Sequence, residues 1–423
     1  MRPEHQNSPT FMSGSRFFYG YIVVIASFFI FFAAFGIRLS YGVFFMPMST
    51  ELGWSNSTTA LAYSISAIIE GIFNIIFGGL TDKYGPRIVT TICGVLIGAG
   101  YCLMPFVHSI WQFYLFYGLI LGVGMGGIFA PLIAVITRWF KTRRSVMSGL
   151  VISGNGLGLL VVSPLATQLI IREGWRSAFL IIGISVLIII VVAAQFLKRD
   201  PSLLGLLPDG RPSTSAQAET PVVSGLSFRQ TLKSYQTWLC FFMFFTMGFY
   251  LVGNQIYLVP DAVNAGMSVT NAALILSTFG VMNVVGNFGL GVVADKIGNK
   301  RIFFFGFMVL MLSSLFIVAG NFLASFFIFA IIAGLANGGM TTSMAPLVAS
   351  LFGLKSIGVI AGLCGFGNTL GQAAGPYVIG NILDRTHNFQ AALSICIIVA
   401  FAGLILLINL KPVKNALHES ARL

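Results

Sequence analysis

The strongest constraint on this chain is a series of long apolar runs, each broken by a turn or a charge cluster. A helix needs about 20 apolar residues to cross the hydrocarbon core of a bilayer, and the runs have that length. We therefore predict an all-α membrane protein with twelve transmembrane helices. The first six are expected near 18–47, 58–80, 88–107, 111–137, 145–170 and 177–197, and the second six near 236–258, 272–294, 302–320, 322–351, 357–383 and 391–410.

Composition excludes several classes of soluble protein. The sequence is 57% hydrophobic and only 9% charged, whereas about a quarter of the residues in a soluble protein are charged. The formal net charge of +12 would suggest nucleic-acid binding in a soluble chain, but here the basic residues sit in short loops between apolar runs. We find no phosphate-binding G-x-x-x-x-G-K-[ST] loop, no metal-ligand cluster and no soluble segment large enough for catalysis. We expect no enzyme activity, no cofactor, no metal and no nucleic-acid partner.

The distribution of Lys and Arg predicts an orientation. With the N-terminus placed in the cytoplasm, all but four of the 24 Lys and Arg residues fall in cytoplasmic segments. The exceptions are Arg172, Arg176 and Arg385 outside, and Arg38 within a span. This bias predicts a multi-pass protein of the cell (inner) membrane with both termini cytoplasmic.

An internal repeat divides the chain. GGLTDKYGPR at 78–87 returns as GVVADKIGNKR at 291–301, and the offset from Asp82 to Asp295 also matches Asn155 with Asn368. An offset kept across most of each half indicates a parallel repeat, so we predict two six-helix pseudo-symmetric bundles. The expected divisions are a cytoplasmic N-terminus at 1–17, an N-terminal bundle at 18–197, a cytoplasmic linker at 198–235, a C-terminal bundle at 236–410 and a cytoplasmic tail at 411–423.

The two halves, the linker and the G-x-x-x-D-K-x-G motif after the second and eighth spans resemble the major facilitator superfamily over essentially the whole chain. The resemblance implies alternating access and a conformational latch in these two loops. Glycines permit a tight turn there, and the neighbouring cations can hold Asp82. The alternative is that the charges only enforce topology and turn geometry. The latch residues are Gly78, Asp82, Lys83, Gly85, Arg87, Asp295, Lys296 and Gly298.

Finer features resemble the branch that holds monocarboxylate transporters and oxalate:formate antiporters. They are FYGYIVV in the first span, RLSYGVFFMPMSTELGWS at 38–55, RDPSLLGLLPDG after the sixth span and YLVPDAVNAGMS at 257–268. The resemblance implies a small organic anion as substrate. Members of that branch carry an arginine in span eight, four residues after an asparagine, that pairs with the substrate carboxylate. This chain has Asn283 at the first position and Asn287 at the second, so it departs from the pattern.

Arg38 is the only basic residue inside a span, and Tyr41 follows one turn later. A charge in hydrocarbon costs at least a few kcal/mol on insertion scales, so it should face a wet cavity or a partner. We therefore place Arg38 first among the anion-binding candidates. The alternative is a side chain that snorkels to the outer interface.

Glu70 is the only acid in the middle of a predicted span, with Asn74 one turn further on the same face. Burial favours the protonated form of a carboxyl, which suits Glu70 to proton coupling. An ion pair with Arg38 is an equal alternative, and a pair that opens on protonation would satisfy both.

Amides and tyrosines complete the candidate set. Asn283 and Asn287 present two amides on one face of span eight, for a carboxylate or for hydrogen bonds between helices. Spans one, four, seven and ten surround the cavity in the superfamily, which favours Tyr117, Asn254 and Asn337 as further substrate contacts, with packing as the alternative for each. Gly367, Gly371 and Gly375 form a small-residue face that allows close helix approach.

We expect a secondary active transporter of a small organic anion, monocarboxylate-like, driven by proton coupling or exchange. The expected partners are this solute, protons and the lipid bilayer, and the protein is expected to be a monomer. One alternative is a transporter or exporter of neutral or cationic compounds, favoured by the missing arginine and by Glu70. A third is a non-transporting membrane sensor.

Overall fold

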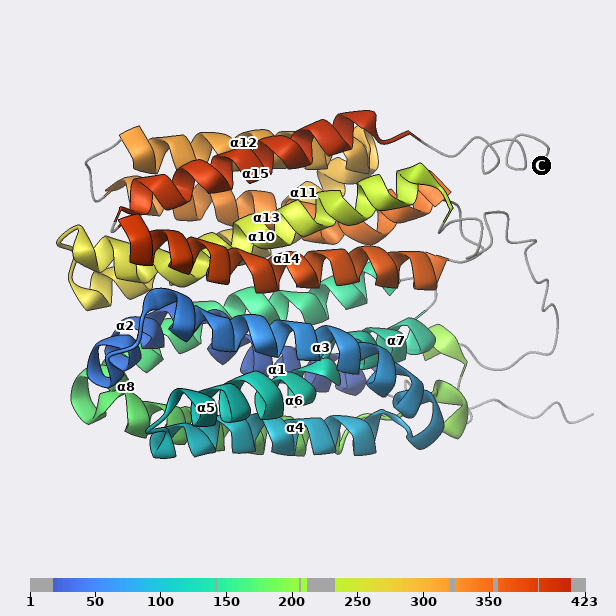
Figure 1. Ribbon diagram of the computed structural model, residues 1–423. Helices are drawn as coiled ribbons and strands as arrows, with labels where there is room; N and C mark the ends of the chain where they lie inside the picture. The colour runs from blue at the N-terminus through green and yellow to red at the C-terminus, as the bar shows by residue number, and fades with distance from the viewer. Residues whose placement is uncertain are drawn as a thin grey trace, which may run out of the picture.

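Long helices lying side by side make up the structure. The computed structural model describes residues 18–140, 144–204, 207–210, 233–319, 324–352, 357–386 and 388–411. The predicted N-terminal segment 1–17, most of the linker and the tail from residue 412 lie outside the described residues. Helices from the N-terminal half occupy the lower part of Figure 1, and those from the C-terminal half occupy the upper part.

The elements follow one another without large insertions. The N-terminal half contains α1 (Gly20–Leu39), α2 (Tyr41–Leu52), α3 (Asn56–Tyr84), α4 (Pro86–Leu103), the 3-10 helix η1 (Met104–Phe106), α5 (Ile110–Phe113), the π-helix η2 (Tyr114–Leu121), α6 (Gly122–Gly126), α7 (Phe129–Trp139) and α8 (Arg144–Ala194). Two short 3-10 helices follow, η3 (Pro201–Leu204) and η4 (Pro208–Gly210). The C-terminal half contains α10 (Tyr235–Asn264), α11 (Val269–Ile297), α12 (Asn299–Ala319), α13 (Ala324–Phe352), α14 (Ile357–Thr386) and α15 (Phe389–Asn409).

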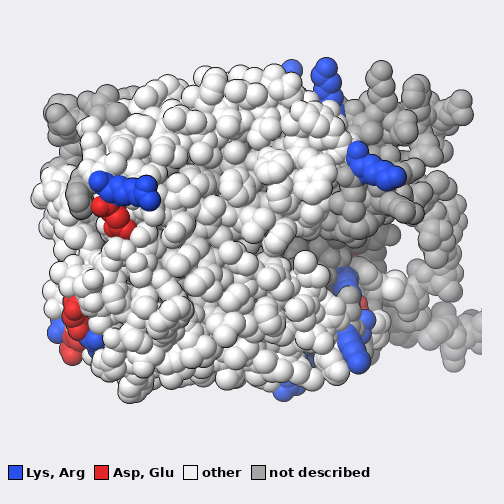
Figure 2. Space-filling view, in the orientation of Figure 1, with Lys and Arg blue, Asp and Glu red and all other residues white. Residues whose placement is uncertain are grey.

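Within the described residues, the predicted spans fall on helices, some on one helix and some on several consecutive ones. Span 111–137, for example, runs through α5, η2, α6 and α7. By length and composition, nine helical segments of the described part can cross a membrane. One of them, Val146–Ala194, holds two predicted spans, because α8 continues through Gly174, whose φ of 78° reverses the chain. Figure 2 shows a face whose broad middle carries no charged residue, with Lys, Arg, Asp and Glu gathered at its two ends.

Glycines set the closest helix contacts in the C-terminal half. Along α14, Gly367, Gly371 and Gly375 lie against the backbone oxygens of Phe241, Phe245 and Phe249 of α10. The matching spacing on both helices shows that the predicted small-residue face is a packing face.

The two halves meet along two helix pairs, α3 with α14 and α8 with α11. In the second pair, a Cβ on Gly156 would lie 2.6 Å from the oxygen of Gly280. The hydroxyl of Ser163 donates to Ala273 O at 3.2 Å, and the hydroxyl of Ser277 donates to Leu160 O at 3.1 Å. The crossing is thus tight and polar, without charge.

At the end predicted to face outside, the halves are joined by a cap. Oδ1 and Oδ2 of Asp384, beyond the predicted span in α14, each accept a hydrogen bond at 2.8 Å, from the backbone N–H groups of Asn56 and Ser57 at the start of α3. Free N–H groups and the dipole at a helix N-terminus favour an anion there. Although burial opposes ionisation, these hydrogen bonds hold the pKa of Asp384 below its ordinary value.

A second contact seals the same end. The start of α2 approaches α10 so closely that a Cβ on Gly42 would lie 2.7 Å from the oxygen of Ile256. Next to it, the Tyr257 hydroxyl donates to Pro376 O at 3.0 Å, which ties α10 to α14. We call the contacts of Asp384 with α3 and of Gly42 with α10 the outer seal.

We predict that Gly371→Ala lowers the thermal stability of the protein. The new methyl meets the backbone of α10, and overpacking of this kind costs about 1–3 kcal/mol. Gly365 lies on the same helix with open space around its Cα, so Gly365→Ala is the control and should leave the Tm unchanged or slightly higher. Thermal unfolding in detergent compares the two, and equal Tm values would contradict the packing argument.

We predict that Asp384→Ala opens the outer seal. In a background without native cysteines, a membrane-impermeant thiol reagent should label Val259→Cys faster when the cap is removed. The control is Asn388→Ala, because Asn388 caps α15 within one half by accepting from the N–H of Gln390. If both variants are labelled at the same rate, the cap does not join the halves.

The lowered pKa of Asp384 sets the pH range of this contact. The ionised carboxylate makes the contact, so its stabilisation is complete above the ordinary carboxyl pKa of about 3.9 and is lost as the pH falls through the lowered pKa. In the background without native cysteines, the ratio of the Val259→Cys labelling rates with Asp384 and with Asp384→Ala should therefore stay constant from neutral pH down to about pH 5, because the fall in thiolate fraction cancels in the ratio.

Candidate functional site

Arg38 lies in the interior of the N-terminal half. It is the second-last residue of α1, just before Ser40 interrupts the helix. Its side chain is only 2% exposed, and Nη1 donates to the hydroxyl of Ser66 at 3.0 Å. The guanidinium also lies 4.8 Å from the ring centre of Tyr63, a cation-π distance. The side chain therefore points inward instead of snorkelling to the interface.

Glu70 of α3 is the counter-ion of Arg38. Nη2 of Arg38 lies 2.7 Å from Oε2 of Glu70, an ion-pair distance, although no N–H of Nη2 has hydrogen-bond geometry to an acceptor. The two groups nevertheless attract each other strongly, because Coulomb attraction depends on separation more than on angle. Glu70 is 15% exposed, so the pair is reached through the carboxylate and not through the guanidinium.

Tyrosines surround the pair. The hydroxyl of Tyr41 donates to Thr59 O at 2.7 Å, and its ring centre lies 5.6 Å from that of Tyr63 and 4.9 Å from that of Tyr117. Tyr117 belongs to the π-helix η2, where the wider turn changes which residues face inward. The structure thus brings the predicted residues of α1, α3 and η2 together.

Three residues of this cluster were absent from the sequence prediction: Tyr63, Ser66 and Tyr101 of α4. The first two share the face of α3 that carries Glu70, at a spacing of three or four residues. That periodicity was a usable signal. Tyr101 lacked one, since its helix holds no other predicted substrate contact, and it meets the cluster through Tyr117 at 6.2 Å between ring centres.

The predicted amides of the C-terminal half bind one another or their own helices. Nδ2 of Asn287 donates to Oδ1 of Asn283 at 3.1 Å, and the hydroxyl of Thr342 donates to Oδ1 of Asn287 at 2.9 Å. Asn337 accepts from the hydroxyl of Thr341 at 3.3 Å, and Nδ2 of Asn254 donates to Tyr250 O at 2.7 Å. These contacts match the packing alternative, and none of them reaches the Arg38 cluster.

Gln255 of α10 reaches the other half, as Tyr257 also does through Asn56 O at 3.4 Å. Nε2 of Gln255 donates to Leu39 O at 3.5 Å, at the break between α1 and α2. This residue, and not its neighbour Asn254, lies next to the helix that carries Arg38.

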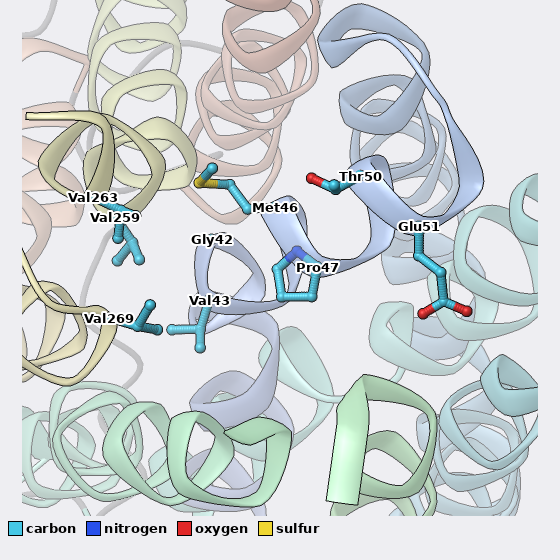
Figure 3. Close-up of a pocket in the computed structure, with 9 residues that line it drawn as sticks. All are labelled: Gly42, Val43, Met46, Pro47, Thr50, Glu51, Val259, Val263 and Val269. Carbon is cyan, nitrogen blue, oxygen red and sulfur yellow. The ribbon is translucent and has the colours of Figure 1, made fainter. Parts of the chain in front are cut away.

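An apolar pocket lies beside the outer seal. It has a volume of about 380 Å³ between α2, α10 and α11. Figure 3 shows Val43, Val259, Val263 and Val269 turned toward one another, with Glu51 directed away from them. Glu51 accepts hydrogen bonds from Trp175 at 2.5 Å and from Arg176. The lining offers no free charge for an anion.

The predicted latch loops are built on left-handed glycines. Gly85 ends α3 with φ of 85°, and Gly298 ends α11 with φ of 91°. Gly78 lies within α3, so the expectation that it helps to form the turn is wrong. The reason is that α3 continues to Tyr84, and one residue of positive φ is enough to reverse the chain.

The latch cations have other partners. Nε of Arg87 donates to Oε1 of Gln195 at 2.8 Å, which ties the start of α4 to the end of α8. Nζ of Lys83 lies 5.1 Å from the ring centre of Tyr84, and Lys296 is exposed. The side chains of Asp82 and Asp295 lie outside the described part, so their pairing stays a prediction.

Comparison with known proteins gives one family. The family model of the Major Facilitator Superfamily matches residues 24–260 and 255–423. Monocarboxylate transporter 12 of Mus musculus is 25% identical over 89% of this chain and 82% of its own. Monocarboxylate transporter 7 of Homo sapiens is 22% identical over 95% and 88%. An uncharacterized MFS-type transporter of Bacillus subtilis is 24% identical over 89% and 90%.

Solved structures agree on the fold. The nucleoside transporter NupG superposes with a TM-score of 0.71 at 14% identity, over 93% of this chain and 98% of that one. An inward-facing, unoccupied bacterial homolog of the human lysosomal transporter Spinster gives a TM-score of 0.68 at 14% identity, over 94% and 95%. The predicted fold class, an all-α membrane protein of two six-helix bundles, is confirmed.

We predict that Glu70→Gln destabilises the protein more than removal of both charges. The single change leaves the buried guanidinium without an anion, which costs about 3–5 kcal/mol when a buried pair is broken. The double variant Arg38→Gln/Glu70→Gln removes the uncompensated charge and should recover most of the loss. Thermal unfolding in detergent measures the order, and a Glu70→Gln protein as stable as the double variant would show that the pair carries no coupling energy.

Proposed function

The chain belongs to the Major Facilitator Superfamily, and from this membership we propose that it carries a small organic anion of the monocarboxylate type across the cell membrane by alternating access. The observation that supports this most is the Arg38–Glu70 pair, a buried cation whose counter-ion is partly exposed. Two of the relatives, monocarboxylate transporters at 25% and 22% identity, favour the same substrate class.

The pair suggests how binding and proton movement are linked. A solute carboxylate that reaches Arg38 supplies the negative charge that Glu70 now supplies. Glu70 is then a carboxylate without a cation in a poorly solvated place, where the protonated form is favoured. Solute binding and proton uptake by Glu70 thereby become one event, and the fully loaded site carries no more charge than the empty one.

Alternating access requires contacts that break at one end while others form. The outer seal is closed in this structure, and the α8–α11 crossing holds no ion pair among the described residues. In the proposed orientation both termini are cytoplasmic, the bundles are 18–197 and 236–410, and the protein acts as a monomer. The latch loops would then close the cytoplasmic end when the outer seal opens.

One observation favours a second substrate class. Asn287, which stands where the branch has its arginine, is engaged with Asn283 and Thr342, so the C-terminal half supplies no cation there for an anion. A neutral or cationic compound would use Glu70 as its partner instead, with Arg38 as the group that releases it.

We predict that proteoliposomes holding the protein take up labelled lactate, pyruvate, oxalate or formate, and that an inward proton gradient drives the uptake. Arg38→Gln should abolish uptake, because the solute loses its counter-charge. Glu70→Gln should remove the effect of the gradient while solute exchange persists, because the proton carrier is lost but the binding charge remains.

The Arg176–Glu51 pair provides the matched control, since it is an arginine–carboxylate pair at the end of the helices. Arg176→Gln should reduce uptake far less than Arg38→Gln. Full uptake by Arg38→Gln would refute the anion site. Uptake of a hydrophobic cation but of no carboxylate would establish the second substrate class.

A further inference from the structure

Two phenols and one guanidinium nitrogen of the Arg38 cluster make no hydrogen bond to a described residue. They are the hydroxyls of Tyr101 and Tyr117, and Nη2 of Arg38, which pairs with Glu70 by charge at 2.7 Å without hydrogen-bond geometry. Tyr101 is 0% exposed and Tyr117 is 1% exposed. Because a buried donor without an acceptor costs roughly 1–3 kcal/mol, native structures rarely keep such groups unless a bound molecule satisfies them.

The three donors belong to one cluster. The rings of Tyr101 and Tyr117 meet edge to face at 6.2 Å between centres. Tyr117 also packs on Tyr41, and Tyr41 packs on Tyr63, whose ring centre lies 4.8 Å from the guanidinium. The donors come from α1, α4 and η2, three elements that meet at this cluster.

Other buried tyrosines of the same fold are satisfied. The hydroxyl of Tyr250 donates to Leu310 O at 2.6 Å, and that of Tyr41 donates to Thr59 O. Tyr257 donates to Pro376 O. Unpaired phenols are therefore a feature of the Arg38 cluster and not of buried tyrosines in this chain generally.

Glu70 does not satisfy the phenols either. Its carboxylate lies against Arg38 and accepts from neither Tyr101 nor Tyr117. An acceptor that meets all three donors at once must carry several lone pairs on neighbouring oxygens. A carboxylate has two oxygens with about four acceptor positions, whereas a neutral amine has one lone pair and an alkyl cation has none.

We propose that Tyr101 and Tyr117 donate hydrogen bonds to the carboxylate of the solute that Arg38 holds, so that α1, α4 and η2 form a three-donor oxyanion site. This inference rests on the proposed function, because it adds Tyr101 to the residues that bind the same solute and gives Tyr117, already a predicted contact, the role of a hydrogen-bond donor. It makes the N-terminal half alone responsible for recognition of the carboxylate. It also gives α4 a binding role that its place in the sequence did not indicate.

The test is Tyr101→Phe and Tyr117→Phe, each with two measurements on purified protein. The first is the Kd for lactate, pyruvate, oxalate or formate, whichever wild-type protein binds most tightly. A hydrogen bond to a charged group is lost in each variant, so the Kd should rise by about tenfold or more. The second is the Tm without solute, which should not fall, because the removed hydroxyl had no protein partner.

Tyr250→Phe is the matched control. It removes a hydroxyl that has a protein acceptor, Leu310 O, so the Tm should fall while the Kd stays at the wild-type value. The control separates loss of a structural hydrogen bond from loss of a ligand contact.

The outcomes distinguish this inference from the proposed function. If wild-type protein binds none of the four carboxylates, both fail. If it binds one and both Phe variants bind it equally well, only the three-donor site fails. If the Phe variants lose thermal stability while their Kd is unchanged, the phenols hold structural water and the inference is again overturned.

Discussion

The attraction between Arg38 and Glu70 organises the N-terminal half. Arg38 is the only charged side chain in the described residues that is buried completely, and a lone charge at this depth costs at least a few kcal/mol. The pair fixes the position of α1 along α3. Ser66 accepts a hydrogen bond from the same guanidinium, and the ring of Tyr63 packs against it. The exposed part of the pair is at Glu70, since the Arg38 side chain is 2% exposed and the Glu70 side chain is 15% exposed.

The contacts between the halves follow a different principle. They consist of glycine backbones, hydroxyl-to-carbonyl hydrogen bonds and one carboxylate on a helix N-terminus. Backbone groups at a helix end are satisfied by water as readily as by Asp384, so the cap can open without leaving a buried charge. The strong interaction therefore lies within one half, and the exchangeable interactions lie between the halves. That division suits a protein whose halves must move while its binding site stays intact.

Hydropathy predicted the helices because it measures the property that places a segment in lipid, and the predicted limits near 58–80 and 391–410 differ from α3 and α15 by a few residues at most. It could not predict the break at Ser40 or the π-helix at Tyr114–Leu121, because both depend on hydrogen-bond register and leave the apolar pattern unchanged. The charged pair was predictable, since each member lacks another partner in its span. Tyr101 was not, because a tyrosine in a helix of mixed composition looks like any packing residue until its hydroxyl is found without an acceptor.

The polar groups of the two halves differ in kind, and this bears on how the transporter works. The described interior of the C-terminal half holds amides and hydroxyls that pair with each other, as Asn283, Asn287 and Thr342 do, while the N-terminal half holds the buried charge. An anion held by Arg38 would therefore stay with the N-terminal half through the cycle. The C-terminal half would present an uncharged surface that closes the site toward the outside or toward the cytoplasm. In the proposed mechanism, these paired amides and hydroxyls offer no second site that would hold a charged solute, and release would follow the return of the Glu70 carboxylate to Arg38.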